Sequence, residues 1–515
     1  MWVVVLALGG VLFLVVVSSQ AAPGDLDPGF GKGGRVMTAF ASAHNHAYAI
    51  ALQPDGRIVA VGETERGSRF DFAVARYERN GALDRTFGVG GKTVTALGTK
   101  NAAATAVAIS PDGDILAAGP TAVSHSVHDQ FVLVRYARNG ALDTGFGSGG
   151  TVDAPFAVDN IGVFLTARLA LQSDGKILLA ATTAAANSPL YHFALARYNR
   201  DGYLDASFGD GGVVTTGFGA DAVVLSGVAI QPDGKIVVAG YRLDVAPQGA
   251  SLGGFALARY SRDGSLDPTF GSGGLVTTTI ASGGAAAAAV AVQQDGRIVA
   301  AGLAYTARDL QGAKVALARY EPDGSLDASF GAGGTVTTAL GDDPSVRGIG
   351  IRSDGKIVVA GRFRDQQSMF ALARYDADGA LDSRFGRGGV VRTAFDIGDA
   401  EANALAIQRD GKILAAGSSE DPDAATTTFA LARYLDSQAV CLVPKLTRKP
   451  LGEARRAITR AHCSLGAVRH AVSNRTRKGR VVAQQPAPGA RLPAGAKVRL
   501  VVSKGSRPDR RKEGS

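Results

Sequence analysis

Cysteine and long apolar segments are scarce in this sequence. Only two cysteines occur in 515 residues, so most of the chain cannot be a disulfide-dense scaffold. The single long apolar run, residues 2–17, is shorter than the roughly 20 residues of a membrane-spanning helix. Small residues follow it, an order typical of a secretory signal peptide, although the basic residues that usually precede the apolar part are missing. We therefore expect residues 1–22 to be a signal peptide, with an N-terminal anchor as the alternative.

Acidic residues are scarce at the C-terminal end. Residues 441–515 contain 19 Lys and Arg against 3 Asp and Glu, whereas residues 1–440 contain 36 against 43. This asymmetry predicts an anionic partner for the basic end, because a surface of one sign attracts polyanions. A merely solubilising tail is the alternative, and we expect no specific nucleic-acid partner.

The signatures of common enzyme classes are absent. The seven histidines have no acid or cysteine neighbours at zinc-site spacing. No Gly-x-Ser-x-Gly phrase stands in a strand–turn–helix context, and no Walker-type Lys-Ser/Thr follows the glycine-rich phrases. We therefore expect no metal and no cofactor, and the sequence names no catalytic residue. A pair of carboxylates assembled in space, as in a glycosidase, stays open.

Repetition is what the sequence has in abundance. Three phrases recur seven times each at spacings near sixty residues, a period typical of solenoids, propellers and arrays. The phrase Leu-Asp-x-x-Phe-Gly-x-Gly-Gly begins at Leu26, Leu83, Leu142, Leu204, Leu266, Leu326 and Leu381. An Asp-Gly turn between apolar runs begins at Asp55, Asp112, Asp174, Asp233, Asp295, Asp354 and Asp410. A Phe-Ala-x-Ala-Arg-Tyr-like run ends at Tyr77, Tyr136, Tyr198, Tyr260, Tyr320, Tyr375 and Tyr434.

Strand chemistry favours the propeller among these architectures. Each unit holds short runs rich in Val and Ile between turns, such as residues 235–240, and these are too short for helices. With the run after each Gly-Gly, a unit has four strands, which is one propeller blade. A lone fourth strand, residues 34–40, opens the array, and the last unit ends after its third strand at Tyr434. We predict an all-β seven-bladed β-propeller over residues 23–437, in which the N-terminal strand closes the last blade and removes the open edge.

The repeat resembles the delta-60 β-propeller repeat family. The hallmark of that family runs from Asp-Gly-Lys-Ile-Val-Val-Ala-Gly through Ala-Arg-Tyr to Leu-Asp-x-x-Phe-Gly, and residues 232–271 carry it closely. The resemblance covers residues 26–434. It implies the propeller fold and an exported setting but no agreed activity, so function has to be argued from individual sites.

An arginine precedes the tyrosine of each third strand, on a strand that we expect to be covered on both faces. A buried guanidinium needs a partner, and the only equally recurrent acid nearby is the aspartate of Leu-Asp. Because bidentate pairing suits a planar guanidinium, we predict one structural Arg–Asp pair in each blade, with a ring of anion-binding arginines as the alternative. The arginines are Arg76, Arg135, Arg197, Arg259, Arg319, Arg374 and Arg433, and the aspartates are Asp27, Asp84, Asp143, Asp205, Asp267, Asp327 and Asp382.

Two sets of loops vary from unit to unit, whereas the turns at the other end of the blades are nearly uniform. The variable loops join the second strand to the third and the fourth strand to the next blade, as in residues 241–254 and 303–312. Both sets lie on one face of a propeller. Variation on a rigid scaffold suits recognition, so we expect an unknown ligand or protein to bind at this face or in the central channel.

Residues 438–505 are predicted to form a small α+β domain. Leu451, Ala454, Ile458 and Ala461 share one face of a helix, and three strands are expected at residues 466–472, 480–484 and 497–503. The segment resembles a PASTA domain. The matching residues are Val443, Pro444, Leu446, Leu451, Ala454, Gly479, Val481, Gln484, Pro486, Pro488, Gly489, Gly495, Val498, Ser503 and Gly505.

The PASTA resemblance implies association with peptidoglycan or another anionic cell-wall polymer. Candidate contacts on its surface are the cations Arg469, Arg475, Arg477, Lys478 and Arg480. In an exported protein, Cys441 and Cys463 are expected to form a disulfide. Residues 506–515 are expected to be a disordered basic tail.

Together these features predict an exported bacterial protein, secreted or at the cell surface in association with the wall, that binds rather than catalyses. One alternative is a propeller-based hydrolase or lyase acting on cell-wall or extracellular polysaccharide, and another is a purely structural surface component. A cluster of three or more carboxylates or histidines at the channel mouth would favour the enzyme.

Overall fold

The chain divides into two compact units. The computed structural model describes residues 3–8, 11–16, 22–98, 101–122, 128–159, 166–184, 190–246, 249–307, 312–364, 367–395, 398–436, 440–461, 463–493 and 496–506. One unit is Leu26–Tyr434, and the other combines Met1–Asp25 with Leu435–Ser515.

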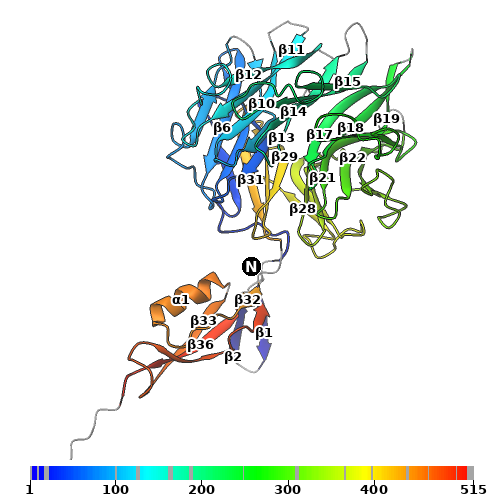
Figure 1. Ribbon diagram of the computed structural model, residues 1–515. Coiled ribbons are helices and arrows are strands. Elements are labelled where there is room, and N and C mark those ends of the chain that lie inside the picture. Colours follow the sequence, from blue (N-terminus) through cyan, green and yellow to red (C-terminus); the bar gives the residue numbers. More distant parts are fainter. Residues whose placement is uncertain are drawn as a thin grey trace, which may run out of the picture. The chain divides into compact units, whose positions relative to one another are not determined.

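The unit Leu26–Tyr434 is a propeller of seven antiparallel sheets, or blades, each with four strands except that the first strand of blade 2 is split (Figure 1). Blades 1 and 2 are β4 (Asn45–Leu52), β5 (Ile58–Arg66), β6 (Arg69–Tyr77) and β7 (Lys92–Thr95), then β8 (Asn101–Ala102) with β9 (Ala106–Ile109), β10 (Ile115–Ala122), β11 (His128–Tyr136) and β12 (Thr151–Asp159). Blades 3 and 4 are β13 (Arg168–Leu171), β14 (Ile177–Ala184), β15 (Tyr191–Tyr198) and β16 (Val213–Thr216), then β17 (Ala222–Ile230), β18 (Ile236–Ala246), β19 (Gly249–Tyr260) and β20 (Leu275–Thr278).

Blades 5 to 7 continue the same order along the chain. They are β21 (Ala285–Val292), β22 (Ile298–Ala304), β23 (Lys314–Tyr320) and β24 (Thr335–Thr338); β25 (Gly348–Ile351), β26 (Ile357–Arg364), β27 (Ser368–Tyr375) and β28 (Val390–Thr393); and β29 (Ala400–Ile407), β30 (Ile413–Asp421), β31 (Thr426–Tyr434) and β3 (Arg35–Thr38).

The ring is closed by the N-terminal strand, as the sequence predicts. β3 pairs antiparallel with β31, with Arg35 opposite Ala432 and Thr38 opposite Phe429. β4 of blade 1 in turn contacts β29, β30 and β31 of blade 7. The fourth strand of the last blade therefore comes from the start of the propeller sequence, which removes a free sheet edge.

The hydrophobic core lies between neighbouring blades. One cluster, for example, joins Leu414 and Phe429 of blade 7 to Ala60 and Tyr77 of blade 1. Alanines on the facing strands let the sheets approach closely, while the seven tyrosines that end the third strands are at most 1% exposed. Burying one such aromatic side chain contributes about 1.5–3 kcal/mol, so these contacts dominate cohesion between blades.

The tyrosine hydroxyls bind threonines of the preceding blade. Tyr77 Oη, for example, lies 2.9 Å from Thr38 Oγ1. Blade 3 departs from this pattern, because the hydroxyl of Tyr198 has no hydrogen-bond partner in the part of the chain that the structure describes. The fourth strand of blade 2 carries Ala154 where the other fourth strands carry threonine.

The second unit contains the predicted helix and three-stranded sheet. Helix α1 (Leu451–Arg460) packs on a sheet of order β33 (Ser464–Ala471), β36 (Lys497–Ser503) and β34 (Val481–Gln485), in which β33 and β36 run parallel. Ala454 and Ile458 of the helix enter a core with Val481, Val498 and Leu500. β32 (Val440–Leu442) pairs with β35 (Arg491–Pro493), and β1 (Val3–Leu8) pairs with β2 (Val11–Val16).

Among the described residues, no helix combines the length and the apolar character needed to span a bilayer. The strands β1 and β2 lie within the segment for which the sequence predicts a signal peptide or anchor, and that prediction stays untested.

Candidate functional site

The recurrent arginine and aspartate meet in every blade. Their nearest nitrogen and oxygen atoms lie 2.6–2.9 Å apart, and each guanidinium lies over the phenylalanine of the Phe-Gly phrase, with 4.4–4.6 Å from Cζ to the ring centroid. The pairs are Arg76–Asp84, Arg135–Asp143, Arg197–Asp205, Arg259–Asp267, Arg319–Asp327, Arg374–Asp382 and Arg433–Asp27.

The pairs do not have the bidentate geometry that the sequence led us to expect. In blade 1, Nε of Arg76 donates to Oδ2 of Asp84, while Oδ1 accepts the backbone N–H of Thr86 and so is already used. Nη1 of Arg76 donates to the carbonyl of Arg138 in the next blade. The guanidinium thus joins two blades, and its buried position leaves it no access to a ligand.

A second cation completes these pairs everywhere except in blade 2. Six of the aspartates lie 2.5–3.2 Å from a lysine or arginine that follows the Asp-Gly turn. Blade 2 has Asp114 at that position, and burial raises the pKa of Asp114. Its pair is also more open, with Arg135 17% and Asp143 27% exposed. Blade 2 therefore provides an internal comparison for the energy of the other pairs.

A one-residue bulge interrupts the first strand of blades 1, 4, 5 and 7. In blade 1 the register between β4 and β5 shifts between Ala47 and Ala49, so Tyr48 is left without a cross-strand partner. The bulged backbone lies so close to Gly62 that a Cβ there would be 1.8 Å from the carbonyl oxygen of His46. Glycine is required by this approach, and the bulge re-aims the side chain of Tyr48.

Side chains at the position of Tyr48 line a cavity in four blades: Tyr48, Thr105, Arg347 and Asn403. The first strands of successive blades contact one another around the ring, and this cavity, which measures about 790 Å³, is lined by residues of blades 1, 2, 3, 6 and 7. It lies where first strands begin and second strands end, which is the face that the variable loops indicated. Its charged lining includes Glu63, Arg168, Arg347, Arg362 and Glu401.

A phenol and a carboxyl group meet on the blade 1 side of this cavity. The Tyr48 hydroxyl donates to Oε1 of Glu63 at 2.8 Å. Burial raises the pKa of Glu63, and burial together with the Glu63 charge raises the pKa of Tyr48. The ring of His46 stacks beside Tyr48, and burial with the charge of His44 lowers the pKa of His46. At neutral pH His46 is therefore neutral.

A second carboxylate on blade 7 has the opposite environment. Oε1 of Glu401 lies 3.0 Å from Nε of Arg347, and Oε2 lies 3.6 Å from Nη1 of Arg362. The hydroxyl of Ser345 also donates to Glu401, at 2.8 Å. Burial alone would raise the pKa of Glu401, but the two arginines and the hydroxyl outweigh it and hold the pKa below its usual value. One cavity thus contains two glutamates whose proton affinities are shifted apart.

Arg168 is the cation on the blade 3 side. Its Nε donates to the carbonyl of Ser226 at 2.7 Å, and its Nη1 donates to the carbonyl of Ala167 at 3.0 Å. Burial, and to a smaller extent the charge of Arg347, lower the pKa of Arg168 to about 10. The side chain remains charged at neutral pH in a site that disfavours the charge.

In the described residues, no His, Cys, Asp and Glu side chains form a group of three or more that could hold a metal ion.

Sequence reasoning indicated this face and the central channel but named none of the lining residues, because it followed positions that all blades share. The informative positions are those where one blade departs from the rest. Six residues before the Asp of the turn, the seven blades carry Ala49, Ala106, Arg168, Gly227, Ala289, Gly348 and Ala404. One residue earlier, the position of the bulge, they carry Tyr48, Thr105, Ala167, Ser226, Ala288, Arg347 and Asn403. Aligning the repeats with one another would have singled out Arg168, Tyr48 and Arg347.

The cations predicted on the C-terminal unit do not converge on one cavity. Arg469, Arg475, Arg477 and Lys478 are exposed, whereas Arg480 is half-buried and donates from Nη1 to the carbonyl of Arg448 at 2.7 Å. Of the five, only Arg475 lines the groove of about 740 Å³ between the segments 447–448, 472–476 and 481–482.

The cysteine pair is described only in part. Cys463 is buried in the core beside helix α1. The side chain of Cys441 lies outside the described residues, so the disulfide stays a prediction.

Two family models match the chain. The model described as "Domain of unknown function (DUF5122) beta-propeller" matches residues 53–87, 110–146, 172–208, 231–270, 293–330, 352–385 and 408–435, and the PASTA domain matches residues 442–504. No curated protein matches the chain.

Three solved structures are similar to the chain at low identity. The polysaccharide lyase Uly1 is 13% identical with a TM-score of 0.46, over 82% of this chain and 98% of that one. A protein of unknown function from Dyadobacter fermentans is 14% identical with a TM-score of 0.42, over 79% and 99%. An α-L-arabinofuranosidase, Arb93a from Fusarium graminearum, is 10% identical with a TM-score of 0.41, over 80% and 98%. Similarity at this level says nothing of activity in this chain. By its seven repeats the chain belongs to the DUF5122 β-propeller repeat family, and it ends in a PASTA domain.

Proposed function

We propose that this is an exported bacterial binding protein that attaches to the cell wall through its PASTA domain and presents the propeller as a recognition module. The observation that carries the proposal is the PASTA domain together with its charge. Between residues 440 and 506 the only acidic residue is Glu453, and it pairs with Lys449. This segment therefore carries far more positive than negative charge, which suits an anionic polymer.

Three exposed cations on one connection test the wall contact. Arg475, Arg477 and Lys478 lie between β33 and β34, and their replacement by alanine removes three charges without touching the core. If each contributes about 0.5 kcal/mol to binding, the triple variant should bind purified insoluble wall on the order of tenfold more weakly. The measurement is co-sedimentation of the full chain with wall, across a salt series that includes about 0.15 M.

A matched variant removes the same charge from the propeller. Lys32, Arg85 and Arg387 are exposed, and Lys32→Ala with Arg85→Ala and Arg387→Ala should leave sedimentation unchanged. Equal losses in the two triple variants would show charge attraction without a site. Binding that vanishes at modest salt would refute specific docking.

A second candidate function is a hydrolase or lyase acting on wall or extracellular polysaccharide. Glu63, Asp399, Glu401 and Glu420 line the cavity together with His46, and these are the residue types that the criterion above requires for the enzyme. The opposite pKa shifts of Glu63 and Glu401 favour this candidate, because an acid and a base in one site are separated in this way.

Product release from polygalacturonate and from purified wall distinguishes this enzyme from a binding protein. The readouts are new reducing ends and the ultraviolet absorbance of unsaturated sugars. If the chain is an enzyme, Glu63→Gln should slow release by about a hundredfold or more. Glu65→Gln, at a half-buried residue of the same strand that does not line the cavity, should leave the rate unchanged. No release from either polymer removes this candidate.

The export part of the proposal is tested through the two cysteines. Disulfides persist in oxidising compartments, so the Cys441–Cys463 bond would support an extracellular setting. Alkylation of the unreduced full chain should leave both cysteines unmodified, and reduction should make both reactive. Two reactive thiols without reduction would count against this part of the proposal.

A further inference from the structure

Arg168 is half-buried at the wall of the cavity and differs in its partners from the buried arginines of the blades. Each blade arginine, such as Arg197, faces a carboxylate. Arg168 has only the carbonyl oxygens of Ser226 and Ala167, and in the described part of the chain it forms no ion pair with an acidic side chain. The nearest charge that lowers its pKa is Arg347, which is also positive. A guanidinium in this position needs an anionic partner, and no acidic side chain of the described residues supplies one.

The fold itself does not require an arginine at this position. The six equivalent residues are alanine or glycine, as with Ala106 and Gly227 in the flanking blades. Those blades fold with the same first strand and the same contact to their neighbours. Arg168 therefore departs from the small residue of the other blades at a cost in stability. Departures of this kind are characteristic of functional sites.

The rest of the cavity offers hydrogen-bonding groups, and its two other arginines, Arg347 and Arg362, are each paired with Glu401. Glu63 and Glu401 present carboxyl oxygens, while Asn403 and Thr105 line the same space. A multiply charged anion would meet repulsion from these carboxyl groups. A ligand with one carboxylate for Arg168 and several hydroxyls for the acceptors would match both halves of the lining.

We propose that this cavity binds a carboxylate-bearing saccharide, with the sugar carboxylate on Arg168 and the sugar hydroxyls on the glutamate side. The cavity, about 790 Å³, is in the range of small-ligand sites. The inference rests on the proposed role of the propeller as the recognition part, and it names the ligand class. Two sources have this chemistry: a polyuronate, and a wall fragment whose amino sugar bears a lactyl carboxylate.

Calorimetry of the full chain with three soluble probes tests the proposal. The probes are trigalacturonate, its fully methyl-esterified form, and the wall disaccharide of N-acetylglucosamine and N-acetylmuramic acid. We expect at least one of the two acids to bind, and the ester to bind at least about tenfold more weakly than trigalacturonate if that acid is the ligand, as for the loss of a hydrogen bond to a charged group. The tighter of the two acids identifies the source.

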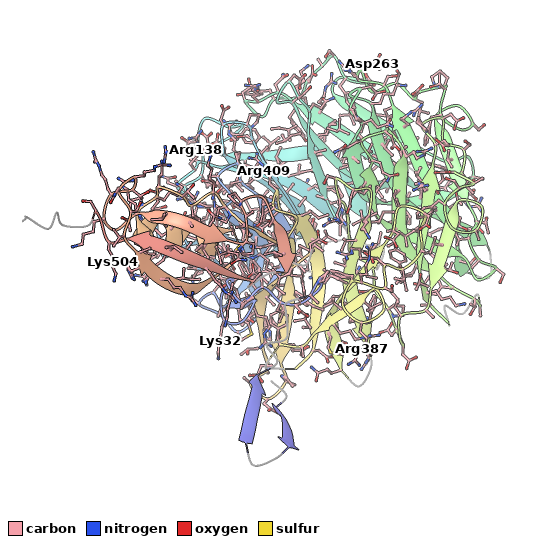
Figure 2. All side chains as sticks on the ribbon, turned by 90° about the horizontal axis from the view of Figure 1, so that it is seen from below. Lys32, Arg138, Asp263, Arg387, Arg409 and Lys504 are labelled. Atoms are coloured by element: carbon pink, nitrogen blue, oxygen red, sulfur yellow. The ribbon has the colours of Figure 1, made fainter. Side chains whose placement is uncertain are left out.

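The variant Arg168→Ala installs the residue type of the other blades and should fold. It should weaken binding of the acid about tenfold to a hundredfold while the melting temperature stays equal or rises, because a half-buried charge without an acidic partner is removed. Arg387→Ala removes a charge at the outer edge of the propeller, where Figure 2 shows that side chain, and should change neither quantity. Arg168→Gln serves as a second variant and should weaken binding in the same way.

Three results would overturn the proposal: no binding of either acid, equal binding of acid and ester, or undiminished binding by both Arg168 variants. Sedimentation with wall is measured in parallel and separates this inference from the proposed function. A chain that binds the acid but does not pellet with wall refutes only the wall docking. A chain that pellets but does not bind the acid refutes only the ligand class.

Discussion

The substitution Asp84→Asn should destabilise the protein strongly, and the same change at Asp143 should not. Asparagine keeps the shape and the Oδ1 acceptor of aspartate but removes the charge. At Asp84, 2% exposed, the carboxylate faces Arg76 at 2.8 Å and Arg57 at 3.1 Å, and both guanidinium groups would be left without it. Removing one partner of a buried pair costs about 3–5 kcal/mol. At Asp143, 27% exposed and with a single cation, solvent screens the loss and we expect about 1 kcal/mol.

Equilibrium unfolding in urea, followed by far-ultraviolet circular dichroism, measures the free energy of unfolding of both variants. The expected difference between them is about 2–4 kcal/mol. Equal costs for the two substitutions would refute the argument, because burial and the second cation would then not determine the strength of a pair. A cost at Asp84 below about 1 kcal/mol would show that the pairs contribute no more than surface ion pairs do.

Other substitutions and acid titration test the remaining departures from the repeat. Asp114→Lys should raise the free energy of unfolding by about 1 kcal/mol, because it gives Asp143 the second cation that the other blades have, and a lower urea midpoint would contradict this. Ala154→Thr should stabilise by about 1 kcal/mol by pairing with the hydroxyl of Tyr198, whereas Ala154→Val, which has the same shape without the hydroxyl, should not. The pKa of Asp382 is lowered: burial opposes this, but Lys356 and other partners outweigh it. Aspartates of this kind stabilise the fold fully above about pH 4 and lose that contribution as pH falls toward their folded pKa, so unfolding measured at pH 4 and below should become progressively easier, and a flat profile would refute this.

The fold could be predicted because the sequence of one blade is repeated seven times. Each copy has similar strands, turns and glycines, and the unmatched strand before the first unit identifies the closing strand β3. The Arg–Asp partnership is visible for the same reason, since two charged residues that recur together at fixed spacing lie within reach of each other. The geometry of the Arg–Asp pair, in contrast, cannot be predicted from the sequence. The Oδ1 atom of each aspartate is already bound to backbone in its own turn, as at Thr86, and sequence spacing does not reveal that.

The residues of the candidate site could not be predicted, because they are exceptions to the repeat that meet only in space. Tyr48 and Arg347 lie about 300 residues apart in sequence, yet both line the cavity, because ring closure brings blades 1 and 6 around one axis. The direction of Tyr48 depends on a one-residue bulge in the first strand that periodicity does not reveal, since the strand pattern continues through it. The shifted proton affinities of Glu63 and Glu401 depend in turn on which cations reach each carboxyl group.

The closure of the ring by β3 also sets an order of events during synthesis. β3 leaves the ribosome about 390 residues before its partner β31 and, at about 5–20 residues per second, waits roughly 20–80 s for it. Throughout that interval the growing propeller has two unpaired sheet edges, which are prone to join other chains. Completion of the last blade therefore removes these unpaired edges. Deleting sequence at either end of the propeller would expose them again in the folded protein.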